Sequence, residues 1–156
     1  MAFIHLGDHI PNPHTGERIS SAQRLNEIIE LAKLAEQAGL DFFSVGESHQ
    51  EYFTTQAHSV VLAAIAQATD TLKIASSSTI ISTSDPVRVY EDFATIDLIS
   101  KGRTEIIAGR ASRVGLFDLL GYNVRDYEEL FEEKFELLLQ INKEEIDALI
   151  FVSQTG

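Results

Sequence analysis

The chain has 156 residues, of which 44% are hydrophobic, a size and composition that suit one globular domain with a proper core. Its formal charge of −12 argues against binding to nucleic acid or to anionic membranes. It contains no cysteine, which excludes disulfides and thiolate metal sites and suits the cytoplasm. The N-terminus has no signal-peptide pattern, and no apolar run approaches ~20 residues, so we expect a soluble, unprocessed protein.

Four short apolar runs predict the strands of a parallel sheet. They are near-continuous rather than alternating, as in strands that are buried on both faces. Their starts recur at intervals of roughly 30 to 40 residues, which is the length of one βα unit with its loops. The runs are residues 2–6, 40–45, 72–75 and 104–108.

Two helices are expected between the first three runs. The first opens at Ser20, where Gln23 completes a capping-box pattern, and ends at Gly39. The second covers residues 55–69, and we expect His58 to cap or line it. This helix is small and apolar on almost every side, which indicates close packing.

Two further helices follow in the second half of the chain. One begins with Asp85 as N-cap and Pro86 at the first helical position, and it ends before Gly102. The other starts at Asp126, where Glu129 completes a second capping-box pattern. The alternation of strands and helices predicts an α/β fold.

Length alone leaves two architectures. A chain of this size normally forms a doubly wound, flavodoxin-like open sheet of about five strands, and residues 146–156 could supply the fifth. A (β/α)8 barrel needs roughly 250 residues, so four units would make about half of one.

The stretch VGESHQEYF places Glu47, Ser48 and His49 directly after the second predicted strand. In parallel α/β folds the carboxyl ends of the strands hold the chemistry, although an ordinary polar surface loop would read the same way. We expect no metal site: His5 and His9 lie on a strand and its exit, where a spacing of four does not bring two ligands together. The chain has no glycine-rich phosphate loop of the dinucleotide or P-loop type.

Longer segments resemble the bacterial luciferase-like flavin monooxygenase family. They are GLDFFSVGESHQEYF (residues 39–53), LKIASSSTIISTSDPVRVYEDFATIDLISKGRTEIIAGRAS (residues 72–112) and GLFDLLGYNVRDYEELFEEKFELLL (residues 115–139). The resemblance implies the N-terminal half of a (β/α)8 TIM barrel, with reduced flavin, oxygen and a small organic substrate at its mouth. The cofactor it implies is FMN, with a deazaflavin as the alternative.

The resemblance also assigns roles to residues. Glu47, Ser48 and His49 would be catalytic, although the family often has histidine where this chain has Ser48, and serine does not titrate near neutrality. The flavin contacts would be Ser77, Ser78, Glu91, Gly109, Arg110 and Ser112. Within that set, a non-prolyl cis peptide is expected at Ser77–Ser78, and Arg110 would face the flavin phosphate or ribityl chain and pair with Glu91. The family usually has glycine at Ala111.

One partial domain over residues 1–156 is therefore expected, with residues 144–156 as an atypical tail. A truncated barrel has exposed strand edges, so we expect self-association into a homo-oligomer. Two other functions stay open. The chain could be a non-catalytic half-barrel with weak or no flavin binding, or a flavodoxin-like electron carrier with a phosphate loop at SQTG. Strand order separates the electron carrier from the other two.

Overall fold

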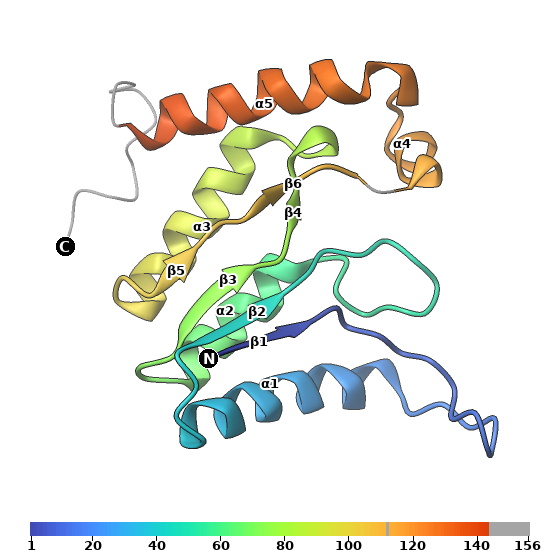
Figure 1. Ribbon diagram of the computed structural model, residues 1–156, viewed down its shortest axis with the longest axis vertical. Helices are drawn as coiled ribbons and strands as arrows, with labels where there is room; N and C mark the ends of the chain where they lie inside the picture. The colour runs from blue at the N-terminus through green and yellow to red at the C-terminus, as the bar shows by residue number, and fades with distance from the viewer. Residues whose placement is uncertain (112, 144–156) are drawn as a thin grey trace.

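Four parallel strands form the main sheet of this computed structural model, which describes residues 1–111 and 113–143. Their spatial order, β1-β2-β3-β5, follows the order of the chain (Figure 1). All four were predicted from the apolar runs. Their bounds are β1 (Ala2–His5), β2 (Phe42–Val45), β3 (Lys73–Ser76) and β5 (Thr104–Glu105).

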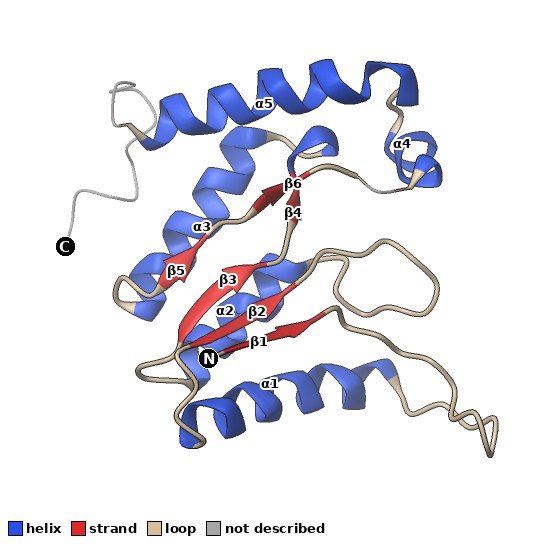
Figure 2. Cartoon of the chain, in the orientation of Figure 1, coloured by secondary structure: helices blue, strands red, loops and turns tan. Residues whose placement is uncertain are grey.

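The main helices follow the strands in alternation, as the sequence predicted (Figure 2). The first three return the chain to the start of the next strand, which is the crossover that parallel pairing requires. The main helices are α1 (Ser21–Gln37), α2 (His58–Ala68), α3 (Pro86–Ser100) and α5 (Tyr127–Asn142).

Short elements at the carboxyl ends of the strands were not predicted from the sequence. β4 (Thr79–Ile80) and β6 (Ala108–Gly109) pair in parallel and continue the paths of β3 and β5. A 3-10 turn, η1 (Ile81–Thr83), and a short helix, α4 (Val114–Leu120), then line the same end. Elements of two to seven residues carry too little periodicity to be recognised from sequence.

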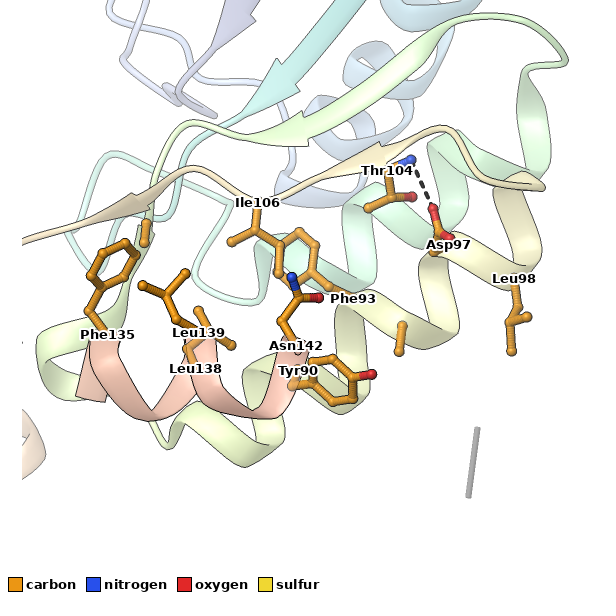
Figure 3. Close-up of a pocket in the computed structure, with 12 residues that line it drawn as sticks. Tyr90, Phe93, Asp97, Leu98, Thr104, Ile106, Phe135, Leu138, Leu139 and Asn142 are labelled. Carbon is orange, nitrogen blue, oxygen red and sulfur yellow. Dashed lines mark hydrogen bonds between the residues drawn. The ribbon is translucent and has the colours of Figure 1, made fainter. Parts of the chain in front are cut away.

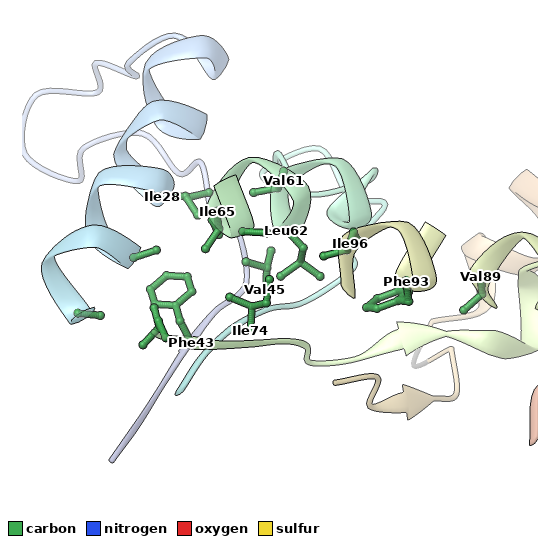
Figure 4. Packing of buried hydrophobic residues seen from close by; sticks show 14 of the residues in the cluster. Ile28, Phe43, Val45, Val61, Leu62, Ile65, Ile74, Val89, Phe93 and Ile96 are labelled. Atoms are coloured by element: carbon green, nitrogen blue, oxygen red, sulfur yellow. The ribbon is translucent and has the colours of Figure 1, made fainter. Parts of the chain in front are cut away.

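The core lies between the sheet and its helices. Phe43 and Val45 of β2 and Ile74 of β3 are fully buried and point toward α1, α2 and α3 (Figure 4). A single hydrophobic cluster joins these side chains to residues of all four main helices. The helices therefore cover one face of the sheet, as in a (β/α)8 barrel. A flavodoxin-like sheet has helices on both faces and a reversed strand order, so the open-sheet alternative is excluded.

Two of the three helix N-caps predicted from the sequence form the expected hydrogen bonds. The Ser20 hydroxyl accepts from the Gln23 N–H at 3.1 Å, and the Asp85 carboxylate accepts from the N–H groups of Val87 and Arg88. Both caps agree with the sequence. The second capping box was wrong: the Asp126 side chain makes no capping bond, because Asp126 belongs to a 3-10 turn, η2 (Val124–Asp126), that leads into α5.

The second helix begins three residues later than predicted. Thr55 is fully buried, and its hydroxyl donates to the carbonyl of Leu6 at 3.0 Å. This bond ties the segment before α2 to the loop after β1 rather than to a helical turn. The helix therefore begins at His58.

Two charged side chains close the amino-terminal end of the sheet. The Arg103 guanidinium donates to the carbonyls of Ala66, Thr69 and Leu72, so it satisfies the end of α2 and the chain that leads into β3. The Glu36 carboxylate accepts from three backbone N–H groups of residues 70–72 and from the Thr71 hydroxyl. We call this pair of side chains the lower clamp.

The predictions for residues 144–156, a fifth strand and a flavodoxin-like phosphate loop, lie outside the described residues. Among the helices that the structure describes, none has the length and hydropathy that a membrane crossing needs.

Candidate functional site

Glu47 lies at the mouth of the sheet, directly after β2, with its side chain only 7% exposed. Its backbone N–H donates to the Ser78 carbonyl at 3.2 Å. Its Oε2 atom accepts from the Ile80 N–H at 2.7 Å. A Cβ atom at Gly46 would lie 2.7 Å from the Ser77 carbonyl oxygen, so glycine is required for this close approach. The strand end thus holds a buried carboxylate in one orientation.

His49 pairs with this carboxylate. Its Nε2 atom lies 2.7 Å from Glu47 Oε1, and its side chain is 20% exposed. A carboxylate bonded to one ring nitrogen orients the imidazole and leaves the other nitrogen for exchange with a bound molecule. We call Glu47 and His49 the dyad.

A cavity of about 470 Å³ adjoins the dyad. Its walls come from the loops after β1 and β2, from β4 and from the start of α4, with both polar and apolar side chains. They are Leu6, Glu47, Ser48, His49, Gln50, Phe53, Ile80, Arg113, Gly115 and Leu116. All three predicted catalytic residues therefore reach one cavity, which we call the inner cavity.

Ser77 and Ser78 lie beside Glu47, whose N–H donates to the Ser78 carbonyl, but they are not among the residues that line the inner cavity. The peptide bond between them is cis, as the family resemblance implied. The hydroxyl of Ser77 is buried and has no hydrogen-bond partner among the described residues. A Cβ atom at Gly109 would lie 2.1 Å from the Ser78 hydroxyl, so the absence of a side chain there allows β6 to pack against Ser78.

The predicted cationic part of the site is arranged differently from expectation. The exposed Arg110 places its guanidinium 4.1 Å from the centre of the Phe131 ring, on α5. The expected pairing with Glu91 is wrong, because Glu91 instead accepts from Arg88 at 2.7 Å, one helical turn away on α3. Roles of Arg110 and Glu91 toward flavin stay predictions, and Ser112 lies outside the described residues.

Arg113 is a cation that the sequence reasoning missed. It lines the inner cavity and forms no ion pair within the described part of the chain. A planar guanidinium suits phosphate or carboxylate oxygens. The family resemblance assigned a role to Arg110, three residues earlier, and no local signal distinguishes the two arginines.

His58 was expected to cap or line the second helix, and the structure places it behind the dyad. It is the first residue of α2, is buried, and has Nδ1 3.8 Å from Glu47 Oε2. Its Nε2 lies 2.8 Å from the Thr79 hydroxyl. Burial lowers the pKa of His58, although the negative charges of Glu47 and Asp92 oppose that effect. Glu47 and His58 are eleven positions apart in the sequence, and no motif joins them.

A second, slightly larger cavity lies among the helices that cover the sheet, away from the dyad. It occupies about 490 Å³ between α3, β5 and α5, with a mostly apolar lining (Figure 3). Its Asp97 carboxylate already accepts from the Thr104 N–H at 3.1 Å. With no titratable pair in it, this groove is a weaker candidate for chemistry than the inner cavity.

Comparison with known proteins identifies the family. The model of the family described as luciferase-like monooxygenase matches residues 3–148. This chain belongs to that family. Among curated proteins, the uncharacterised protein y4vJ of Sinorhizobium fredii (strain NBRC 101917 / NGR234) is 27% identical over 132 residues, which are 84% of this chain and 38% of y4vJ.

Solved structures share the fold. Apo-MsnO8 superposes with a TM-score of 0.82 at 24% identity, over 100% of this chain and 45% of MsnO8. The oxygenating constituent of 3,6-diketocamphane monooxygenase from Pseudomonas putida, solved with FMN, gives 0.74 at 17% identity, over 86% of this chain and 39% of that one. The chain therefore spans less than half the length of these relatives.

Cofactors differ among the similar structures. The camphane enzyme is in complex with FMN, whereas a tetrahydromethanopterin reductase from Methanopyrus kandleri, described as coenzyme F420 dependent, matches with a TM-score of 0.57 at 24% identity, over 77% of this chain and 29% of the reductase. Both kinds of flavin thus occur on this fold.

Proposed function

We propose that this chain forms the flavin-binding half of a luciferase-like monooxygenase that uses FMN and oxygen to oxidise a small organic substrate. The observation that carries the proposal is the buried Glu47–His49 pair in the wall of a cavity at the carboxyl ends of parallel strands. Family membership adds the cofactor class. A deazaflavin is the alternative cofactor.

The residues present fit a flavin. The buried Ser77 hydroxyl has no partner in the described chain, so it can bond to a polar edge of a ligand. Phe53, Ile80 and Leu116 supply apolar wall for a ring system. Reduced flavin, when bound, supplies the electrons with which oxygen is activated.

The dyad would handle protons in this reaction. Glu47 holds Nε2 of His49 and fixes the orientation of the ring, which leaves Nδ1 to accept or release a proton at the substrate. Ser48 lines the same cavity and can only donate or accept a hydrogen bond. In this proposal His49 takes the proton-handling part that histidine one position earlier has in many relatives.

Arg113 would contribute charge rather than proton transfer. Its permanently charged guanidinium at the cavity edge can hold the flavin phosphate or an acidic group of the substrate. Arg110, stacked on Phe131, would act on the flavin only if it left that ring.

The proposal includes self-association. The edge strands of the main sheet are β1 and β5, and apolar side chains on or just after them are exposed: Ile4 at 63%, Leu6 at 51% and Ile107 at 46%. A second copy would cover this surface and the strand edges that have no neighbour among the described strands. Light scattering during the flavin titration measures the mass of the species that binds.

A titration of the chain with FMN, followed by quenching of flavin fluorescence, tests the proposal. We expect saturable binding with a Kd on the order of micromolar. Gly115→Trp is the diagnostic variant, because Gly115 lines the inner cavity and a Cβ there meets open space. The added indole should fill the cavity and weaken binding at least about 10-fold.

Leu119→Trp is the matched control. Leu119 lies on the same short helix and is 65% exposed, and it does not line the inner cavity. Its FMN affinity should equal that of the wild type. Absence of saturation up to millimolar FMN, or equal loss in both variants, would overturn the proposed site and leave a non-catalytic half-barrel.

A further inference from the structure

A third cavity, of about 250 Å³, lies on the other side of Glu47, between the starts of α2 and α3. The buried side chains of His58, Thr79 and Phe93 line it, as do Asp85, the N-cap of α3, and Arg88 and Asp92 of α3. We call it the outer cavity. Its walls are more charged than those of the inner cavity, and Arg88 and Asp92 are exposed to solvent.

Glu47 is the single residue, within the described part of the chain, that lines both the inner and the outer cavity. Its two carboxylate oxygens divide between them. Oε1 bonds to His49 on the inner side, whereas Oε2 accepts from the Ile80 N–H and lies 3.8 Å from His58 Nδ1 on the outer side. One buried carboxylate therefore faces two histidines across the wall of the site.

We propose that His58 is a positioning residue for the Glu47–His49 dyad, and that it acts on Glu47 from the outer cavity. This inference takes its catalytic meaning from the proposed function, but the contact it describes exists without flavin. While His58 is neutral, the Glu47 carboxylate interacts mainly with His49, through the hydrogen bond between Oε1 and Nε2. When His58 is protonated, its Nδ1–H competes for that carboxylate, and the bond to His49 weakens.

The surroundings set the direction of this effect. Burial is the largest influence on His58 and lowers its pKa, so the ring is neutral at neutral pH. The charges of Glu47 and Asp92 act in the opposite sense, and the nearby His49 adds to the lowering. Asp85 and Arg88 face the same cavity with opposite charges. Acidification should therefore charge His58 only below the ordinary imidazole range, and this should shift Glu47 away from His49.

Proton and nitrogen NMR of the histidine rings, recorded as a function of pH in the chain without flavin, tests the inference. In the wild type, the signal of the His49 Nε2–H should change with the same midpoint as the ring signals of His58. In His58→Gln, where an amide keeps a bond to Thr79 but carries no charge, this component of the His49 response should vanish. The exposed His14 provides an internal control, because its ring signals should be the same in both proteins at every pH.

Asp92→Asn is the second variant, and it applies even if His58→Gln fails to fold. Asp92 is exposed and accepts from the Ser59 hydroxyl, which an amide oxygen can also do. Loss of its negative charge should lower the pKa of His58, and the His49 response should move to the same lower pH. A His49 response that persists in His58→Gln, or that stays in place when the His58 midpoint moves, would overturn the inference. Either result is independent of FMN binding, so failure here is distinct from failure of the proposed function.

Discussion

The two ends of the sheet use charged side chains in opposite ways. At the amino-terminal end, the lower clamp directs Arg103 and Glu36 at backbone groups of the chain itself, and together they occupy the carbonyls and N–H groups around residues 66–72. At the mouth, Glu47 receives one backbone N–H and shares its other oxygen with a histidine beside a cavity. Nearby, the hydroxyls of Ser77 and Thr83 are buried without a partner in the described chain.

This difference agrees with the general arrangement of (β/α)8 barrels, in which residues at the amino-terminal face stabilise the fold and residues at the carboxyl-terminal face form the active site. Charge that is satisfied by the backbone contributes to folding, whereas polar groups with spare capacity can be satisfied by a ligand. Substitutions at the lower clamp should therefore change the free energy of unfolding, and substitutions at the mouth should change binding.

The largest expected effect is that of Arg103→Ala. It leaves the carbonyls of Ala66, Thr69 and Leu72 without their donor, and we expect it to lower the free energy of unfolding by about 3 kcal/mol. Urea denaturation monitored by circular dichroism measures this loss. Arg88→Ala is the control: its one ion pair is on the surface, so its effect should stay within about 0.5 kcal/mol. If both substitutions lowered the free energy of unfolding equally, the lower clamp would contribute no more to stability than a surface ion pair does.

A smaller effect, dependent on pH, is expected for Glu36→Gln. Burial raises the pKa of Glu36, but hydrogen bonds from Thr71, Leu72 and Asp70 outweigh it and leave the pKa below its ordinary value. The contribution to stability is then present above the pKa of the unfolded carboxyl and is lost as pH falls through the lowered pKa of the folded state.

We expect Glu36→Gln to cost about 1 kcal/mol at neutral pH and to flatten the acid side of the stability profile. Denaturation midpoints between roughly pH 3 and pH 7 give both quantities, over the range where carboxyl groups titrate. Glu30→Gln, on the exposed face of α1 beside Lys33, should leave the profile unchanged. If the stability of the wild type does not change over this pH range, the hydrogen bonds to Glu36 do not lower its pKa in the folded state relative to the unfolded state.

The smallest effect on stability is expected at the mouth. Ser77→Ala removes a buried hydroxyl that has no partner among the described residues, so the free energy of unfolding should change by no more than about 0.5 kcal/mol, or rise slightly. FMN affinity should fall by a few fold, since the hydroxyl is then missing from the ligand's surroundings. The same denaturation and fluorescence assays measure both. A clear loss of stability with unchanged FMN affinity would mean that Ser77, like the lower clamp, stabilises the fold and does not contact the ligand.

Much of the fold was predictable because its signals are local. The apolar runs predicted all four strands of the main sheet. Ser20 and Asp85 predicted two helix starts, because each side chain accepts a hydrogen bond from a backbone N–H two or three residues further along. The prediction at Asp126 failed because a 3-10 turn took the place of the expected cap. Short elements such as β4, β6 and α4 lack the length for a periodic pattern.

The sequence by itself determined the βα alternation and the place of the Glu47-Ser48-His49 segment after a strand, because these are properties of neighbouring residues. The Ser77–Ser78 cis peptide was expected only from the family resemblance. Only the tertiary structure decided that Glu47 bonds to His49, that Glu91 pairs with Arg88, that Arg113 reaches the inner cavity, and that His58 stands behind the dyad. Those contacts depend on how separate loops and helices meet at the ends of the strands. Side-chain distances of this kind are set by packing, and no spacing along the chain encodes them.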